Sequence, residues 1–267
     1  MENPKYLYHY TSIETLALIL ESKKIRFNRL DNVDDLEEAE TSDLGNLGRY
    51  CFVSCWTEDK EESIPFWGMY TRDMKGVRIK MPSDMFKTYE VHQTDARVSV
   101  KTEKFSKFKP SEIFRQDTLI SPPWDNILTK VEYTNDNKLI YPKIIDTNRE
   151  NESGKLYLKF DMLGKYKRQH WAFQNEWRFK FNIVPISRLD KEKGNYIKFI
   201  NHLKDNMNLD IDCYFLDIDE TKLKEMEIIV GPNTTEAEKI IVEALIKKFN
   251  PDAKVFDSSL KNKIKPK

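Results

Sequence analysis

Near its start the sequence changes its hydrophobic period from two to about 3.6, and this change constrains the fold more than any other feature. Residues 6–11 (YLYHYT) alternate aromatic and polar side chains, which is typical of a short strand. Thr11 and Glu14 then fit a capping box that opens a helix. Apolar residues follow at helical spacing, at Ile13, Leu16 and Leu20. A strand that leads directly into an amphipathic helix predicts a domain that combines a sheet with helices.

Short alternating or β-branched segments recur along the chain and predict further strands. They lie at 25–27, 51–56, 76–81, 128–133, 177–183, 212–216 and 226–230. Helices are expected over 63–71, within 156–173 and over 236–249, the last behind a capping box at Thr235 and Glu238. The apolar stripe of this last helix comprises Ala237, Ile240, Ile241, Ala244, Leu245 and Phe249.

These elements predict one α+β domain over residues 1–257, with an insertion around 83–150 and a basic, flexible tail at 258–267. A chain of 267 residues is long enough to bury a substantial core. The polar and acidic segment 28–48 is expected to be a long surface loop that could include a helical turn, with its acidic residues forming a solvated face.

Composition indicates a cytoplasmic chain without a membrane partner. Lys plus Arg, 44 residues, equals Asp plus Glu, 44 residues, so there is no overall attraction to nucleic acid or to an acidic membrane. No stretch reaches the roughly 18–20 apolar residues that cross a bilayer, and the first residues lack a secretory signal pattern. Three cysteines are too few for a disulfide framework and are expected to be reduced.

Several kinds of site are excluded because their motifs are missing. The sequence has no glycine-rich phosphate loop, GxGxxG, HExxH, GxSxG or CxxC pair, and only eight glycines. Cys51 and Cys55 lack the further ligands that a zinc site needs, and the acidic residues of 31–40 match no calcium loop. We therefore expect no metal site.

Two segments carry candidate site residues. His9 lies at the end of the first predicted strand, before a helix N-terminus, where polar groups converge on a ligand; a histidine that merely bonds a neighbouring carbonyl is the alternative. Gln174 and Glu176 precede a predicted strand and project from the same side of extended chain. Glu176 lies among aromatic residues and is either an unusual carboxylate or half of a structural ion pair with Arg178.

Aromatic residues offer candidate stacking surfaces. Phe66, Trp67 and Tyr70 could stack on a flat ligand ring or belong to the core. The segment 101–109 (KTEKFSKFK) interleaves basic residues with Phe105 and Phe108, which suits single-stranded nucleic acid, although a solvated charged segment has the same composition.

Four motifs resemble a family of uncharacterised bacterial and phage domains. They are YHYTS at 8–12, CFVSCW at 51–56, FWGMY at 66–70 and QNEWRF at 174–179. Their order is in turn similar to that of the ADP-ribosyltransferases of the H-Y-E type, except that Phe52 or Tyr50 stands where the strand tyrosine is usual. The resemblance implies an ADP-ribosyltransferase-like split mixed β-sheet core with flanking helices, and NAD as a substrate.

The resemblance also implies roles for residues. Glu176 would stabilise the positive charge that develops on the ribose as nicotinamide leaves, and Gln174 would orient the acceptor. Trp67 or Tyr70 would stack on nicotinamide. The remaining residues that would bind the dinucleotide are His9, Thr11, Ser12, Phe52 and Ser54. Segment 28–48 would cover the bound NAD.

The sequence therefore favours an NAD-dependent ADP-ribosyltransferase, as a toxin or phage-defence effector that modifies a protein, RNA or DNA. An antitoxin protein is a possible partner. Two alternatives remain open: an NAD glycohydrolase, in which water is the acceptor, and a non-catalytic module that senses a nucleotide or binds a protein.

Overall fold

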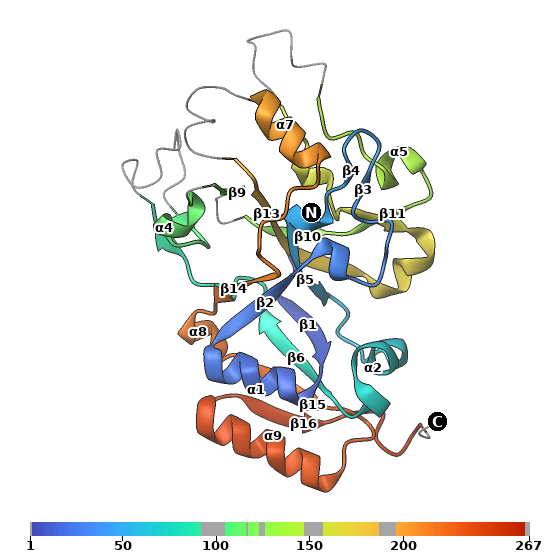
Figure 1. Ribbon diagram of the computed structural model, residues 1–267. Helices are drawn as coiled ribbons and strands as arrows, with labels where there is room; N and C mark the ends of the chain where they lie inside the picture. Colours follow the sequence, from blue (N-terminus) through green and yellow to red (C-terminus); the bar gives the residue numbers. More distant parts are fainter. Residues whose placement is uncertain are drawn as a thin grey trace.

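A mixed sheet of ten strands runs through the molecule, in the order β10-β13-β5-β1-β6-β15-β16 along its main path (Figure 1). The computed structural model describes residues 2–91, 105–115, 117–122, 126–146, 157–186 and 196–264. The strands of the main path are β1 (Tyr6–Thr11), β5 (Cys51–Thr57), β6 (Val77–Pro82), β10 (Leu128–Lys130), β13 (Glu176–Val184), β15 (Glu227–Val230) and β16 (Lys254–Asp257). Beside it lie β2 (Lys24–Arg29), β9 (Leu119–Ser121) and β14 (Cys213–Asp217).

The sheet divides at β5. One edge of β5 pairs with β13 from Cys51 to Thr57. On the other edge β2 pairs only at Phe52 and Val53, and β1 only at Thr57. Strands β1 and β2 therefore diverge from the same edge, and no described strand pairs with residues 54–56 on that side. This divergence opens the space in which the candidate site lies.

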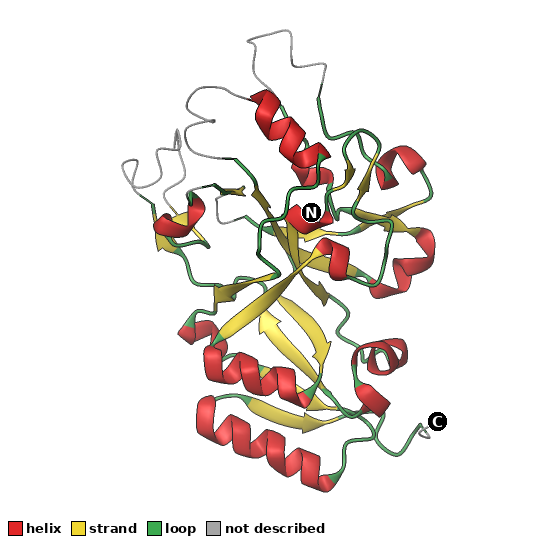
Figure 2. Cartoon of the chain, viewed as in Figure 1, coloured by secondary structure: helices red, strands yellow, loops and turns green. Residues whose placement is uncertain are grey.

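Helices flank the sheet (Figure 2). Helix α1 (Ile13–Ser22) follows β1, and α9 (Glu236–Phe249) packs beside it. Helix α2 (Ile64–Tyr70) connects β5 towards β6, with Pro65 in its first turn, and α7 (Tyr196–Lys204) precedes β14. Short helices are α4 (Pro110–Ile113), α5 (Asn137–Ile140) and α8 (Glu220–Leu223).

Smaller elements surround these. Three two-stranded sheets are formed by β3 (Glu40–Thr41) with β4 (Gly45–Asn46), β7 (Tyr89–Glu90) with β8 (Phe105–Ser106), and β11 (Glu132–Thr134) with β12 (Tyr166–Arg168). Single turns of 3-10 helix are η1 (Leu30–Asn32), η2 (Gly48–Tyr50), η3 (Arg72–Met74), η5 (Phe160–Met162) and the longer η6 (Gln169–Gln174).

The fold confirms the mixed α+β class expected from the sequence. Alternating segments became β1, β6 and β13 because each packs at least one face on the core, and β13 is buried along its whole length. The capping box at Thr235 and Glu238 is present. The first helix is instead capped by Ser12, whose Oγ accepts a hydrogen bond from the Thr15 N–H at 3.1 Å. Thr11 does not cap this helix because it still belongs to β1 and pairs with Val77 of β6.

Segment 28–48 is not the solvated surface loop that the sequence suggested. Leu30, Leu44 and Leu47 are buried and form a second hydrophobic core under the segment. Two of its acidic residues, Asp35 and Glu38, are also buried. Glu38 is paired with cationic side chains from distant parts of the chain, which sequence patterns do not show.

An α-helix was expected within residues 156–173. The structure describes residues 157–173 of this range, and they form η5, β12 and most of η6 instead of an α-helix. Gly164 has a positive φ of 61°, which ends helical geometry at that point. A Cβ at Gly164 would lie 3.2 Å from the Leu30 side chain, so the chain passes close to segment 28–48 here. Strand β12 then places Lys167 next to β13 residues.

The expected insertion and tail are partly attached to the domain. Strands β9 and β10 come from the 83–150 region and pair with β13 in the main sheet. At the start of the 258–267 tail, Ser258 is buried and its Oγ donates to Glu62 at 2.6 Å, while Leu260 packs on the cluster of Tyr10, Phe66 and Trp67. Residues 265–267 lie outside the described part.

Candidate functional site

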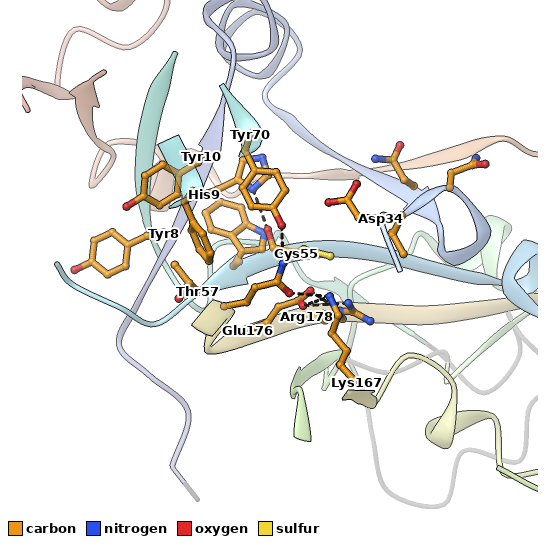
Figure 3. Close-up of a pocket in the computed structure, with 16 residues that line it drawn as sticks. Tyr8, His9, Tyr10, Asp34, Cys55, Thr57, Tyr70, Lys167, Glu176 and Arg178 are labelled. Atoms are coloured by element: carbon orange, nitrogen blue, oxygen red, sulfur yellow. Dashed lines mark hydrogen bonds and ion pairs between the residues drawn. The ribbon is translucent and has the colours of Figure 1, made fainter. Parts of the chain in front are cut away.

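A pocket of about 200 Å³ occupies the place where β1 and β2 diverge from β5 (Figure 3). Strand β1 contributes Tyr8, His9 and Tyr10, and β5 contributes Cys55, Trp56 and Thr57. The remaining lining residues are Asn28, Asn32, Val33, Asp34, Phe66, Tyr70, Lys167, Gln174, Glu176 and Arg178. The segments carrying His9 and Glu176 therefore meet, as the sequence analysis required.

The His9 side chain hydrogen-bonds to the edge of β5 where β1 and β2 diverge. Its Nδ1 lies 2.9 Å from the Cys55 carbonyl oxygen, a group that lies where β5 has no partner among the described strands on that edge. The ring also lies 5.0 Å from the Trp56 ring. Burial lowers the pKa of His9, although the bond to Cys55 opposes this. A neutral ring that donates from Nδ1 keeps Nε2 as an acceptor for a ligand.

Glu176 is an ionised carboxylate inside a buried network. It is only 5% exposed. Its Oε1 accepts from Arg178 Nε at 2.5 Å, and its Oε2 accepts from Lys167 Nζ and Arg178 Nη2, both at 3.1 Å. Burial alone would raise the pKa of Glu176, but the charges of Arg178 and Lys167 outweigh it and hold the pKa at about 2. A carboxylate offers about four acceptor positions, and the fourth is engaged by the Cys55 thiol, so a ligand hydroxyl would have to compete with this weak donor.

A second carboxylate, Glu38, completes the network. It pairs with both terminal nitrogens of Arg178, with Arg178 Nη2 at 3.0 Å, and with Lys167 Nζ at 3.0 Å. Arg178 Nη1 also donates to the Gly164 carbonyl at 3.1 Å. Two carboxylates and two cations thus cancel in charge, and all five N–H groups of Arg178 have acceptors. Sequence reasoning missed Glu38 because it stands in a run of acidic residues that reads as a solvated face, 140 positions before Arg178 in the chain.

Gln174 links this network to Tyr70. Its Oε1 accepts from Lys167 Nζ at 2.7 Å, and its Nε2 donates to the Tyr70 hydroxyl at 2.8 Å. Lys167 therefore uses its three N–H groups on Glu38, Glu176 and Gln174. No donor of these cations is left to bind a phosphate, whereas Glu176 and Asp34 present acceptors to the pocket. The lining favours a neutral or cationic ligand group.

Aromatic rings form the opposite wall. Tyr10 lies edge-on to Phe66 at 5.2 Å and to Trp67 at 4.8 Å, and its hydroxyl accepts from the Ser63 N–H. Tyr70 is 36% exposed and lines the pocket, so it can stack on a ligand. Trp67 is fully buried behind this wall, where its Nε1 donates to Glu62 at 3.1 Å. Of the two proposed stacking residues, only Tyr70 reaches the pocket.

Four other residues predicted to bind the dinucleotide do not line the pocket. Ser12 caps α1, and Thr11 is buried in β1 opposite Val77. Phe52 belongs to the main core, stacked on Phe181 at 5.8 Å. Ser54 accepts a hydrogen bond from Trp56 Nε1 at 3.0 Å. The structure thus gives these residues local roles, whereas His9, Tyr70, Gln174 and Glu176 share the pocket.

The resemblance assigned segment 28–48 to cover the bound NAD, but no motif singled out the wall formed by Asn28, Asn32 and Asp34. These residues line the pocket between β2 and the first turn of segment 28–48. Their only sequence signal is polar residues directly after a short strand. The basic segment 101–109 offers less than expected: Phe108 is fully buried, Phe105 is 52% exposed, and residues 101–104 lie outside the described part.

Neither a cluster of metal-binding side chains nor a membrane-spanning helix is found in the described ranges. No group of three or more His, Cys, Asp or Glu side chains there could hold a metal ion. No helix in the same ranges is long and apolar enough to span a bilayer. Cys51 and Cys55 are free thiols whose pKa values are raised by burial, which keeps them protonated.

No family model, curated protein or solved structure matches this chain. The resemblance of its motifs to ADP-ribosyltransferases therefore stays a prediction, and a functional argument rests on the geometry of the site.

Proposed function

We propose that the pocket binds NAD and that the chain transfers ADP-ribose from it, as an ADP-ribosyltransferase-like enzyme. The observation that carries the proposal is that His9 and Glu176, 167 positions apart in the sequence, line one pocket together with Tyr70. The division of the sheet at β5 supports a split-sheet fold of that kind.

The chemistry of the lining suits the nicotinamide end of NAD. The nicotinamide ring carries a positive charge, and an aromatic wall beside anionic acceptors attracts a flat cation. Because the pocket encloses about 200 Å³, below the roughly 300–1,000 Å³ of typical ligand sites, it suits the nicotinamide and its ribose. The rest of the dinucleotide would extend past Asn28, Asn32 and Asp34.

Glu176 would act on the bond that breaks. The bond between ribose C1 and the nicotinamide nitrogen cleaves, and its electron pair leaves with nicotinamide. Positive charge develops on the ribose, and an ionised Glu176 that accepts a hydrogen bond from a ribose hydroxyl stabilises that charge in the transition state. Its pKa of about 2 keeps it ionised at neutral pH. A nucleophile of the acceptor then bonds to C1 and loses its proton.

The role first suggested for Gln174 changes under this proposal. Both ends of its amide are engaged, by Lys167 and by Tyr70, so it positions these side chains rather than orienting an acceptor. This observation favours a second candidate, hydrolysis of NAD with water as the acceptor, because no other acceptor group is assigned. Both candidates share the same cleavage step.

The test is incubation of the protein with NAD labelled in its adenylate half. Wild-type protein is expected to release nicotinamide, and Glu176→Gln is expected to release it on the order of 100-fold more slowly. Glu90→Gln, which alters an exposed carboxylate on β7, is the matched control and is expected to match wild type. Label that appears on protein, RNA or DNA shows transfer, and label only in free ADP-ribose shows hydrolysis.

Folding and binding must be measured alongside activity. Because Glu176→Gln removes a buried charge, its thermal unfolding is compared with wild type, and Tyr70→Ala provides a second variant that leaves the ion network charged. Nicotinamide release that is unchanged in a folded Glu176→Gln protein would contradict the proposal. NAD that binds to the wild type without being cleaved would instead support a non-catalytic nucleotide sensor.

A further inference from the structure

Helix α9 exposes an apolar stripe on the side that faces away from the sheet. It packs on the core through Val242 and Ile246, which are buried. Ile240 is 57% exposed and Ile241 is 52% exposed, and Ala237 and Ala244 are also exposed. Residues 237, 240, 241 and 244 share one side of an α-helix, so the two isoleucines and two alanines form one continuous stripe.

The charges beside the stripe are separated along the helix. Glu236 lies in the first turn and Glu243 near the middle, whereas Lys247 and Lys248 lie in the last turn. Glu236 and Lys248 form no ion pair with any other described residue, unlike Lys239, which pairs with Asp257 at 2.9 Å. An acidic start and a basic end make the exposed face complementary to a reversed copy of itself.

We infer that this face binds a second copy of the chain, with the two α9 helices antiparallel about a two-fold axis. A two-fold interface brings the same patch of each subunit together. With Ile240 placed opposite the partner's Ala244, a large side chain meets a small one on both sides of the axis. The same register places Glu236 opposite the partner's Lys248, and Ala237 opposite the stem of the partner's Lys247.

Other features of the chain agree with this occupant. Lys plus Arg equals Asp plus Glu, so two copies do not repel one another through net charge. Helix α1, which lies beside α9 (Figure 1), also carries an exposed apolar side chain, Leu18, at 68% exposure. A lipid surface is a poorer occupant, because helices that lie on membranes carry mainly Lys and Arg beside their apolar face, whereas here Glu236 and Glu243 share that position with Lys247 and Lys248.

Sedimentation velocity over a concentration series tests the dimer in the full-length protein. The mass is expected to rise with concentration from the 31.8 kDa of one chain to twice that value. Ile240→Asp is expected to remain at the mass of one chain, because it places carboxylates at the centre of the interface. The matched control is Ile197→Asp, which makes the same change at a 78% exposed isoleucine of α7 and is expected to dimerise like wild type.

Charge reversal tests the antiparallel register. Glu236→Lys and Lys248→Glu are each expected to weaken self-association on the order of tenfold, since each creates two like-charge contacts. An equimolar mixture of these two variants is expected to associate like wild type, because in the mixed dimer the introduced lysine of one chain faces the introduced glutamate of the other. A wild type that stays monomeric throughout, an Ile240→Asp dimer, or a mixture that fails to recover would each overturn the inference. None of these measurements depends on NAD chemistry.

Discussion

Replacing Glu38 with glutamine should lower the free energy of unfolding of the domain, because the Glu38 carboxylate neutralises part of the charge of two buried cations, Lys167 and Arg178. In the native chain Glu38 and Glu176 together offset Lys167 and Arg178. The side chains of Glu38 and Arg178 are each 1% exposed, so water cannot screen the positive charge that Glu38→Gln leaves behind. Removing one partner of a buried ion pair costs about 3–5 kcal/mol of unfolding free energy.

This loss is measurable by equilibrium unfolding in urea. In a domain of this size 1 kcal/mol shifts the melting temperature by roughly 2–4 °C, so Glu38→Gln should melt on the order of 10 °C lower than wild type. The control is Glu220→Gln, which makes the same change in an exposed pair with Lys23 and should leave the midpoint unchanged.

A double variant separates charge imbalance from lost packing. Glu38→Gln combined with Lys167→Met restores a neutral network of Glu176 and Arg178. If unbalanced charge is the cause, the double variant should be more stable than the sum of the single effects predicts. Glu38→Gln that unfolds like Glu220→Gln, or strictly additive effects, would refute this account of the network.

Two further predictions concern the buried lysine on β13 and the aromatic wall. Burial lowers the pKa of Lys180 to about 8, below its unfolded value of 10.5. Between these values the folded state holds fewer protons than the unfolded state, so the free energy of unfolding should rise with pH from about 8 to 10. Urea unfolding across this range should show the rise in wild type and its loss in Lys180→Met. Tyr70→Ala should weaken NAD binding about fivefold in calorimetric titration, since stacking contributes about 1 kcal/mol. Trp67→Phe should lower the melting temperature without changing the affinity for NAD. Equal affinities for wild type and Tyr70→Ala would contradict the assignment of the stacking ring.

The sheet could be predicted from the sequence because its signals are local. Strands β1, β5, β6 and β13 have alternating or β-branched segments with turns between them, and these patterns do not depend on distant partners. The meeting of His9 with Glu176 followed only from the order of the motifs. The division of β5 between β1 and β2, which forms the pocket, depends on register and left no pattern in the sequence.

The errors arose where a residue's partner is far away in the chain. Glu38 has the sequence context of a surface residue, yet it pairs with Arg178, 140 positions later. Residues 156–173 contain apolar side chains at helical spacing, but Gly164 and the pairing of β12 with β11 determine their conformation. In α9 apolar residues surround much of the helix, so periodicity alone did not show that Val242 and Ile246 face the core while Ile240 and Ile241 face solvent.

The most direct test of the site is a crystal structure of the protein with an NAD analogue whose glycosidic bond cannot be cleaved. The account predicts the nicotinamide ring beside Tyr70, a ribose hydroxyl within hydrogen-bond distance of Glu176, and a polar ligand atom at His9 Nε2. An analogue bound elsewhere on the molecule, or a pocket that stays empty at saturating analogue concentration, would contradict the claim that these two distant segments form one NAD site.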